Sequence, residues 1–273
     1  MINGSGRSTE IARQHGLTGL FLESGVSSEK SVFESVDPAN NLPFQPEWPD
    51  LIRLFALIRL RHVTSVLEFG CGFSTVVMAH ALTMNEQHDG AHVRENLRRT
   101  DPFRLHVVDD MQEYLDLTRG RLSQEMSSRV SFHLAAVQMT TFNSRICTEY
   151  ESLPNVCPDF IYLDGPSQDS AVGDVSGIST RHPDRLPMAC DILKIEHFLL
   201  PGTLILMDGR TANARFLKAN LQREWRYEHD QEGDVHYFEM IEEPLGVYNR
   251  RQIEFCLGRE WRAKSLRPDF RAL

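Results

Sequence analysis

The sequence predicts an α/β protein whose mostly parallel sheet is covered by helices on both faces. Short apolar runs, such as 65–69 and 203–208, alternate with longer segments whose apolar residues recur at helical spacing. Several of these runs end in glycine or in an acidic residue. Parallel strands need crossover helices between them, and strands covered on both faces are apolar throughout. The alternation therefore indicates a doubly wound sheet.

The individual elements follow from the spacing of the apolar residues, which differs between helices and strands. We expect strands over 65–69, 105–109, 130–134, 159–164, 203–208, 225–228 and 235–241. We expect helices over 51–61, 74–82, 111–122, 187–199 and 213–225, with one more near 8–15. Asp50 and Asp110 are each placed to cap the following helix, because a carboxylate there accepts a free backbone N–H. Three prolines exclude a regular helix or a central strand from 40–49.

The chain divides into an N-terminal extension, 1–49, and a single larger domain, 50–273. A polar insert over 84–103 separates the first helix of the sheet from the second strand, and a loop of that length is uncommon. Residues 165–186 have neither helical nor strand periodicity, so they form either a substrate lid or a plain crossover loop. Arg181 and His182 in this segment are candidates to bind an anionic acceptor, with solvated surface charge as the alternative.

Composition excludes several classes of protein. The 273 residues carry a net charge of −9, which disfavours a nucleic-acid partner. No segment approaches 18 consecutive apolar residues, so we expect no membrane span. Five cysteines lie far apart without a CxxC pair, which predicts neither a disulfide framework nor a zinc knuckle. We therefore expect a reduced, cytoplasmic protein.

The strongest local motif is a strand, a glycine turn and a helix over 66–75. Gly70 and Gly72 lack a Cβ, so the backbone can turn tightly and approach a ligand. Glu68 at the strand end is an acceptor for a cationic or hydroxyl-bearing ligand. The dinucleotide fingerprint G-x-G-x-x-G is incomplete, because its last position is Thr75. A tight turn without any ligand is the alternative interpretation.

Acidic residues end three further predicted strands. Asp109 follows the second strand, where a carboxylate accepts hydrogen bonds from ribose hydroxyls in doubly wound folds. Asp164 and Asp208 end the fourth and fifth strands, each followed by glycine. Two acids on neighbouring strands can bind Mg²⁺, activate a nucleophile or hold a polar substrate. Each acid on its own could instead cap the helix that follows.

These motifs, in this order, resemble the class I S-adenosylmethionine-dependent methyltransferases. The resemblance covers about residues 50–241 and rests on Glu-x-Gly-x-Gly, the acid after the second strand, Asp-Phe-Ile-Tyr-Leu-Asp-Gly and Leu-Pro-Gly-Thr-Leu-Ile-Leu-Met-Asp. It implies a Rossmann-like fold, with a seven-stranded sheet whose last strand is antiparallel. The chain departs from the family at Ser74, which replaces the third glycine of the common Gly-x-Gly-x-Gly.

The resemblance also implies the roles of individual residues. Glu68, Gly70, Gly72 and Ser74 would line the methionine and ribose end of S-adenosylmethionine. Asp109 would bind the ribose, Ala135 would approach the adenine, and Asp164 would lie beside the sulfonium. These roles are implied by the family resemblance alone.

Together these residues predict methyl transfer to a small-molecule or saccharide-like polar acceptor, and we expect O-methylation. Asp164 and Asp208 are the candidate catalytic residues, and Arg181, His182 and Arg210 the candidate acceptor-binding residues. Mg²⁺ is a candidate ion between the two acids, but Gly209 stands where metal-dependent members carry a second ligand, which favours a metal-free mechanism. The alternatives are a non-catalytic cofactor-binding protein and a nicotinamide-dependent oxidoreductase.

Overall fold

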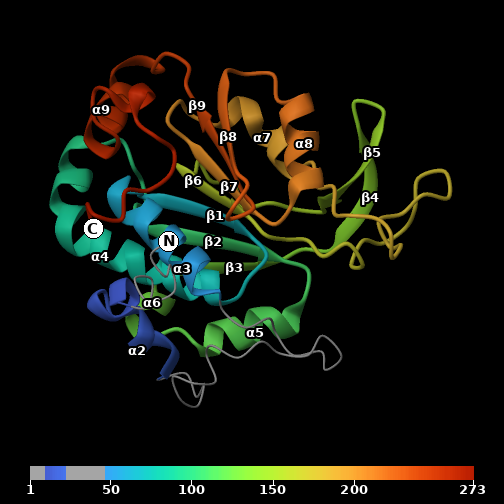
Figure 1. Ribbon diagram of the computed structural model, residues 1–273, viewed down its shortest axis with the longest axis horizontal. Coiled ribbons are helices and arrows are strands. Elements are labelled where there is room, and N and C mark those ends of the chain that lie inside the picture. Colours follow the sequence, from blue (N-terminus) through green and yellow to red (C-terminus); the bar gives the residue numbers. More distant parts are fainter. Residues whose placement is uncertain (1–9, 23–46) are drawn as a thin grey trace.

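The computed structural model describes residues 10–22 and 47–273, which form a seven-stranded sheet flanked by helices (Figure 1). The strand order is β3-β2-β1-β6-β7-β9-β8. Strand β9 runs antiparallel to both of its neighbours, β7 and β8, and the other neighbouring pairs are parallel. The strands are β1 (Ser65–Phe69), β2 (Arg104–Asp109), β3 (Val130–Leu134), β6 (Phe160–Leu163), β7 (Leu204–Asp208), β8 (Trp225–Asp230) and β9 (Val235–Met240). The predicted seven-stranded, mostly parallel sheet is therefore confirmed. The prediction for 1–49 lies largely outside the described residues.

Helices cover both faces of this sheet. The main ones are α3 (Trp48–Leu60), α4 (Phe73–Asn96), α5 (Gln112–Gly120), α7 (Asp191–Ile195), α8 (Thr211–Asn220) and α9 (Gly246–Cys256), with the short α2 (Leu17–Leu22) and α6 (Gln124–Ser127). Side chains alternate between the faces, so Leu206 packs in the core under α3 and α4, and Met207 in the core under α7 and α8. Among the helices of the described segments, none is long and apolar enough to cross a bilayer.

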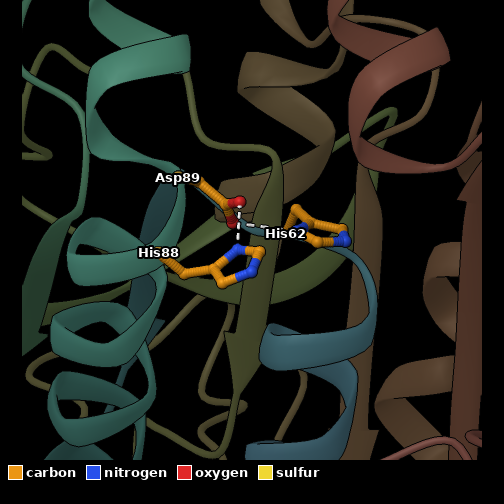
Figure 2. Close-up of side chains that lie close together, drawn as sticks. All are labelled: His62, His88 and Asp89. Carbon is orange, nitrogen blue, oxygen red and sulfur yellow. Dashed lines mark hydrogen bonds and ion pairs between the residues drawn. The ribbon is translucent and has the colours of Figure 1, made fainter.

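The predicted polar loop over 84–103 is wrong, because α4 continues through most of it to Asn96. The buried side of this stretch carries polar residues with fixed partners instead of an apolar stripe. The Asn85 amide donates to the carbonyls of Ile58 and Val63, both at 3.0 Å. Asp89 lies between two histidine rings (Figure 2). A helix buried through hydrogen bonds has no hydrophobic periodicity by which to recognise it.

Both predicted helix caps are also wrong. Helix α3 begins at Trp48 with Pro49 in its first turn, and Asp50 instead forms an ion pair with Arg53 at 2.6 Å. The residue before α5 is Met111, whose N–H donates to Asp109 Oδ1 at 2.8 Å. Asp109, not Asp110, therefore holds the start of that helix. The helices predicted over 187–199 and 213–225 are shorter, ending at Ile195 (with a 3₁₀ turn over Glu196–Phe198) and at Asn220.

Sequence analysis missed a β-hairpin and the last helix. Strands β4 (Val137–Phe142) and β5 (Arg145–Tyr150) form a separate two-stranded sheet that projects from the body of the protein (Figure 1). Asn143 and Ser144 make the turn with φ of 48° and 62°. Two successive positive φ angles are typical of a tight hairpin turn, and asparagine is one of the residues that favours them. Helix α9 packs beside the amino edge of the sheet, where Asn249 donates to the carbonyl of Pro201.

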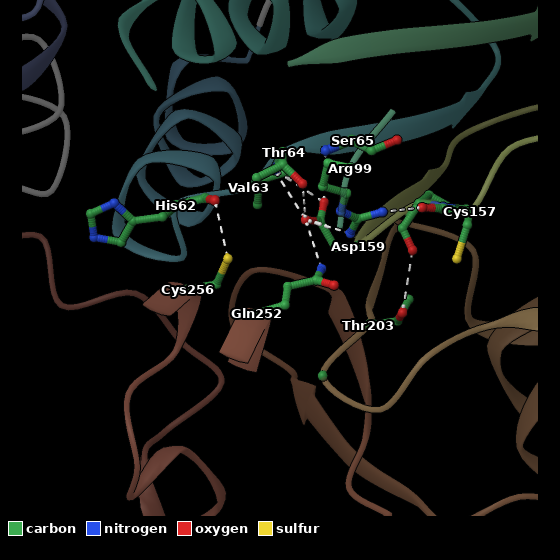
Figure 3. A network of polar contacts seen from close by, with 12 residues as sticks. His62, Val63, Thr64, Ser65, Arg99, Cys157, Asp159, Thr203, Gln252 and Cys256 are labelled. Carbon is green, nitrogen blue, oxygen red and sulfur yellow. Dashed lines mark hydrogen bonds and ion pairs between the residues drawn. The ribbon is translucent and has the colours of Figure 1, made fainter. Parts of the chain in front are cut away.

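One buried carboxylate fixes the amino edge of the sheet (Figure 3). Asp159 precedes β6, and its side chain is 11 % exposed. It accepts hydrogen bonds from the backbone N–H groups of Thr64 and Ser65 at 2.8–3.2 Å, and from Thr64 Oγ1 at 2.7 Å. The Arg99 guanidinium lies 3.0 Å away and Gln252 completes the set at 3.4 Å. Asp159 thus aligns the starts of β1 and β6 and ties α9 to them.

We expect Asp159→Ala to lower the free energy of unfolding by about 3–5 kcal/mol, because Arg99 and two backbone donors lose their partner. Chemical denaturation of the variant and the parent measures this. The control is Asp101→Ala, whose carboxylate is 65 % exposed in its pair with Arg104 and should contribute well under 1 kcal/mol. Equal losses in the two variants would contradict this account.

Candidate functional site

The register of the parallel strands brings four predicted residues into one row. Phe69 pairs with Val108 and with Leu163, and Leu163 pairs with Met207. The next residues along these strands are Gly70, Asp109, Asp164 and Asp208. Residues two positions earlier, such as Tyr162 and Leu206, pack in the core under α3 and α4. The period of two therefore directs all three carboxylates toward that face at the carboxyl edge of the sheet.

The glycine turn after β1 touches the turn after β6. Gly70 has φ of 92°, and a Cβ on it would lie 2.9 Å from the backbone nitrogen of Gly165. A Cβ on Gly165 would in turn lie 2.6 Å from Gly70 N. The Phe69 carbonyl accepts from the N–H groups of both Asp164 and Gly165. By contrast, the space around a Cβ at Gly72 is open. The turn is thus packed on one side and free on the other.

Glu68 lies beneath this turn and is fully buried. Ser74 Oγ and Thr75 Oγ1 donate to its two carboxylate oxygens at 2.5 and 2.7 Å, and Thr75 Oγ1 accepts from Gly72 N–H at 3.1 Å. Burial raises the pKa of Glu68 to about 8, against the lowering effect of these two hydrogen bonds. Glu68 and Ser74 therefore hold the first turn of α4 against β1. Their direct contact with a cofactor stays a prediction.

Asp109 is also buried, beside the thiol of Cys71 in the glycine turn. Burial raises its pKa, and the hydrogen bond from Met111 N–H opposes that rise. The neighbouring Ala135 donates its N–H to the carbonyl of Asp109 at 3.0 Å. Asp110 is half-buried. The residues expected to bind ribose and adenine thus lie side by side.

Asp164 and Asp208 lie close enough to influence each other. Burial raises the pKa of Asp208 to about 7, helped by Asp50 and Asp164 and opposed by Arg53. Burial also raises the pKa of Asp164, and Arg210 opposes that rise. Protein atoms surround Asp164 on most sides, but solvent reaches its side chain. Asp50 and Arg53, on the first turn of α3, belong to this cluster and had no functional signal in the sequence.

Arg210 contacts backbone at this edge. Its Nη1 and Nη2 donate to the carbonyls of Asp164 and Pro166 at 2.5 and 2.8 Å. Its guanidinium therefore ties the end of β7 to the turn after β6. Direct contact of Arg210 with an acceptor stays a prediction.

Among the described residues, Asp164 and Asp208 belong to no group of three His, Cys, Asp or Glu side chains with converging ligand atoms. The cations that face them belong to Arg53 and Arg210, and the carboxylate of Asp50 faces both acids as well. Mg²⁺ prefers six oxygen ligands in near-octahedral geometry. Binding of Mg²⁺ between the two acids stays a prediction that these residues do not support.

The segment 165–186 is irregular, as predicted, with a short pairing between Val175 and Ile178 and another between Val172 and Gln138 of β4. Arg181 and His182 are exposed, and their described hydrogen bonds stay within this segment: Arg181 reaches the Gly173 carbonyl, and the His182 carbonyl accepts from Gln168. The structure thus does not join these two residues to the acids. Closure of the segment over a substrate stays a prediction.

Sequence analysis also missed Tyr150 and Tyr237. The hydroxyl of Tyr150 lies against Gly165, is buried and has no hydrogen-bond partner in the described structure. Burial, with Asp109 and Asp110, raises its pKa well above the ordinary value. Tyr237 likewise has a buried hydroxyl without a partner among the described residues, and burial raises its pKa to about 12. Neither tyrosine stands in a motif, so only the fold brings them to this edge.

A hollow of about 560 Å³ lies between α3, the end of β8 and residues 267–271. Its lining joins apolar groups such as Ile52 and Phe270 to Arg53 and Tyr237. Another hollow, of about 480 Å³, lies between α4 and the start of β2, at the opposite edge of the sheet. The first has the size of a small-molecule site and borders the charged cluster around Asp208.

Comparisons with known proteins found similarity to solved structures but none by sequence. No protein-family model matches the chain, and no curated protein matches it by sequence. An O-methyltransferase from Bacillus cereus, solved with SAH, is similar at 13 % identity over 89 % of this chain and 93 % of that one, with a TM-score of 0.40. An O-methyltransferase of tomaymycin synthesis from Streptomyces achromogenes, solved with SAM, is similar at 14 % identity over 86 % of this chain and 99 % of that one, with a TM-score of 0.42. A precorrin-6y C5,15-methyltransferase from Geobacter metallireducens is similar at 13 % identity over 75 % of this chain and 92 % of that one, with a TM-score of 0.36.

We expect Asp208→Asn to stabilise the protein above pH 7. The folded state keeps the Asp208 proton up to about pH 7, whereas the unfolded chain releases it near pH 3.8, so this group makes stability fall as pH rises between those values. Asparagine removes that loss, and the gain should be on the order of 1 kcal/mol for a half-buried group.

Thermal unfolding from pH 4 to 9 measures this as a difference in Tm between variant and parent. The difference should be near zero at pH 4 and grow toward pH 8. Asp184→Asn, in the exposed loop, is the control for a general charge effect. A difference that shrinks with rising pH would show that Asp208 is not desolvated in the fold.

Proposed function

We propose that the chain is an S-adenosylmethionine-dependent methyltransferase that methylates a hydroxyl of a small polar acceptor. The observation that carries this proposal is the glycine turn, packed against Gly165 on one side and open at Gly72 on the other, in one row with three carboxylates. The strand order, with one antiparallel strand, is the arrangement expected from the family resemblance.

The residues along this row fit the cofactor in our proposal. The open backbone at Gly72, next to the packed Gly70, suits the close approach of the methionine end, with Glu68 and Ser74 holding the turn. Asp109 accepts from the ribose, and Ala135 borders the adenine. The unpartnered Tyr150 hydroxyl beside Gly165 offers a further hydrogen bond to a ligand in this cleft. When bound, S-adenosylmethionine supplies a methyl group activated on a sulfonium.

The acceptor, in this proposal, enters the hollow beside α3 and presents a hydroxyl to Asp208. A carboxylate with a pKa of about 7 is suited to remove a proton near neutral pH. Asp164 holds the acceptor in line with the methyl group, and alignment is the larger part of such a displacement. Arg53 keeps part of the Asp208 population ionised. Arg181 and His182 would meet the acceptor only if the segment 165–186 closes.

The two alternatives differ from this proposal at the same residues. A non-catalytic cofactor-binding protein would need neither Asp164 nor Asp208, whose desolvation costs stability. A nicotinamide-dependent oxidoreductase would use the same turn, whose fingerprint ends in Thr75 instead of glycine. A cytoplasmic location agrees with the five cysteines, all of which lie in described residues and are free thiols.

We expect Gly72→Leu to fold normally and to lose affinity for S-adenosylhomocysteine by at least about tenfold, a change of about 1.4 kcal/mol. A Cβ at this position meets no protein atom within 4 Å, so the leucine side chain starts in open space, which the proposal assigns to the ligand. Isothermal titration calorimetry gives the affinity, and thermal unfolding gives the stability.

The matched variant is Gly70→Ala, which we expect to lose stability because of its positive φ and its contact with Gly165. NAD serves as the control ligand in both titrations. Unchanged binding of S-adenosylhomocysteine to Gly72→Leu would place the site elsewhere, and binding of NAD alone would favour the oxidoreductase.

We expect Asp109→Asn to weaken S-adenosylhomocysteine binding about 5- to 150-fold, the effect of losing one charged acceptor worth about 1–3 kcal/mol. Asparagine keeps an oxygen for the Met111 N–H, so α5 should stay in place. Asp110→Asn, one residue away, is the control and should bind normally. The reverse result would transfer the ribose contact to Asp110.

A further inference from the structure

A second cluster of ligand-type side chains lies away from the carboxyl edge. His62, in the turn after α3, and His88 and Asp89, neighbours on α4, each offer a ligand atom within 4.8 Å of the others (Figure 2). His62 precedes β1, so this cluster lies toward the amino edge of the sheet, opposite the row that ends in Asp208. Neither the proposed cofactor site nor the proposed mechanism uses it.

One carboxylate joins the two rings. Asp89 Oδ2 lies 2.8 Å from His62 Nδ1, and Asp89 Oδ1 lies 2.6 Å from His88 Nδ1. Figure 2 shows the carboxylate between the rings, with both of its oxygens engaged. The Asp89 side chain is 6 % exposed, whereas those of His62 and His88 are 37 % and 70 % exposed. The cluster therefore combines a buried carboxylate, that of Asp89, with two imidazole rings that solvent reaches.

The surrounding groups keep the Asp89 carboxylate charged. Burial alone would raise the pKa of Asp89, but the hydrogen bonds from His62 and His88 outweigh it and lower the pKa. Arg59 of α3 also faces this carboxylate, and the Cys256 thiol of α9 donates to the His62 carbonyl. A fixed negative charge between two imidazoles is the donor set of a metal site with two nitrogens and one carboxylate.

We propose that His62 Nδ1, His88 Nδ1 and the Asp89 carboxylate bind a divalent transition metal ion of the Zn²⁺ type. Imidazole and carboxylate donors suit Zn²⁺, whereas Mg²⁺ prefers oxygen ligands only. Solvent above the exposed His88 ring provides the entry path and a water molecule as fourth ligand. In a neutral ring the Nδ1 proton transfers to Nε2 on binding, and a protonated ring releases one proton to solvent.

The geometry needs only a small adjustment to accept the ion. The two N–O separations would widen from hydrogen-bond length to about 3.3 Å, the value for tetrahedral zinc with bonds near 2.0–2.2 Å. His88 is mostly exposed, so its ring can move by this amount. His62 has a φ of 46°, a conformation that its contact with Asp89 helps to hold.

The other cluster of this kind in the described structure is less suited to a metal. It comprises His229, Asp234 and His236, but both ring nitrogens of His236 are engaged, one with Thr211 at 2.9 Å and one with Tyr227 at 3.0 Å. The His229 and His236 rings stack with centroids 4.0 Å apart, so an ion between them would lie outside the ring planes. This cluster provides an internal control.

The bound ion would be structural. It would link the turn after α3 to the middle of α4, two segments that the Asp89 carboxylate already joins. A ligand that binds only the folded state raises its stability in proportion to its affinity and concentration. Zn²⁺ should therefore raise the Tm of the full chain without any cofactor or acceptor.

The experiment titrates the metal-free full chain with ZnCl₂ by calorimetry and follows Tm with and without Zn²⁺ or Mg²⁺. We expect one Zn²⁺ per chain, a rise in Tm with Zn²⁺ and none with Mg²⁺. His88→Ala should lower the affinity at least about tenfold. His92→Ala, one turn further along the same helix, is the matched control and should bind as the parent does.

Two further measurements keep the test decisive. Circular dichroism verifies that His88→Ala is folded, which its exposed position favours, and Co²⁺ as a substitute ion should give a tetrahedral absorption spectrum that His88→Ala lacks. Absence of Zn²⁺ binding, equal affinity in His88→Ala and the parent, or loss of binding in His229→Ala instead would each overturn the proposal.

Discussion

The in-register pairing of four parallel strands is the constraint on which the candidate site depends. It sets Gly70, Asp109, Asp164 and Asp208 in one row, although they are separated by up to 138 positions between 70 and 208 in the sequence. Side chains in a strand alternate with a period of two, so a slip of one residue would turn a carboxylate into the opposite core. The contact between Gly70 and Gly165 reinforces this register, because a Cβ on either residue would separate the two strand ends.

The two edges of the sheet use carboxylates in opposite ways. At the amino edge, Asp159 is surrounded by donors, so its hydrogen bonds compensate for the loss of water. At the carboxyl edge, Asp164 and Asp208 face each other and Asp50 with fewer donors, and desolvation raises the pKa of both. Carboxylates with raised pKa values are frequent at functional sites.

Helix α4 connects these two regions. Its first turn is held to β1 through Ser74, Thr75 and the buried Glu68, beside the proposed cofactor site. Its middle carries Asp89, which reaches the turn after α3. Polar contacts at both points fix the helix relative to the sheet, so an ion bound at Asp89 would stabilise the scaffold without touching the proposed reacting groups.

The sequence by itself determined the sheet and most of the row of strand ends. Apolar runs that end in glycine or aspartate are local signals, and the parallel pairing of such runs brings their ends together for any protein of this topology. Only the tertiary structure decided that 84–96 is helical, because its buried side is satisfied by hydrogen bonds to other segments and not by an apolar stripe. It likewise decided that Asp109 and not Asp110 starts α5, and that Arg53 and Tyr150 join the site. These are long-range contacts or choices between adjacent residues of one type, which neither composition nor periodicity can distinguish.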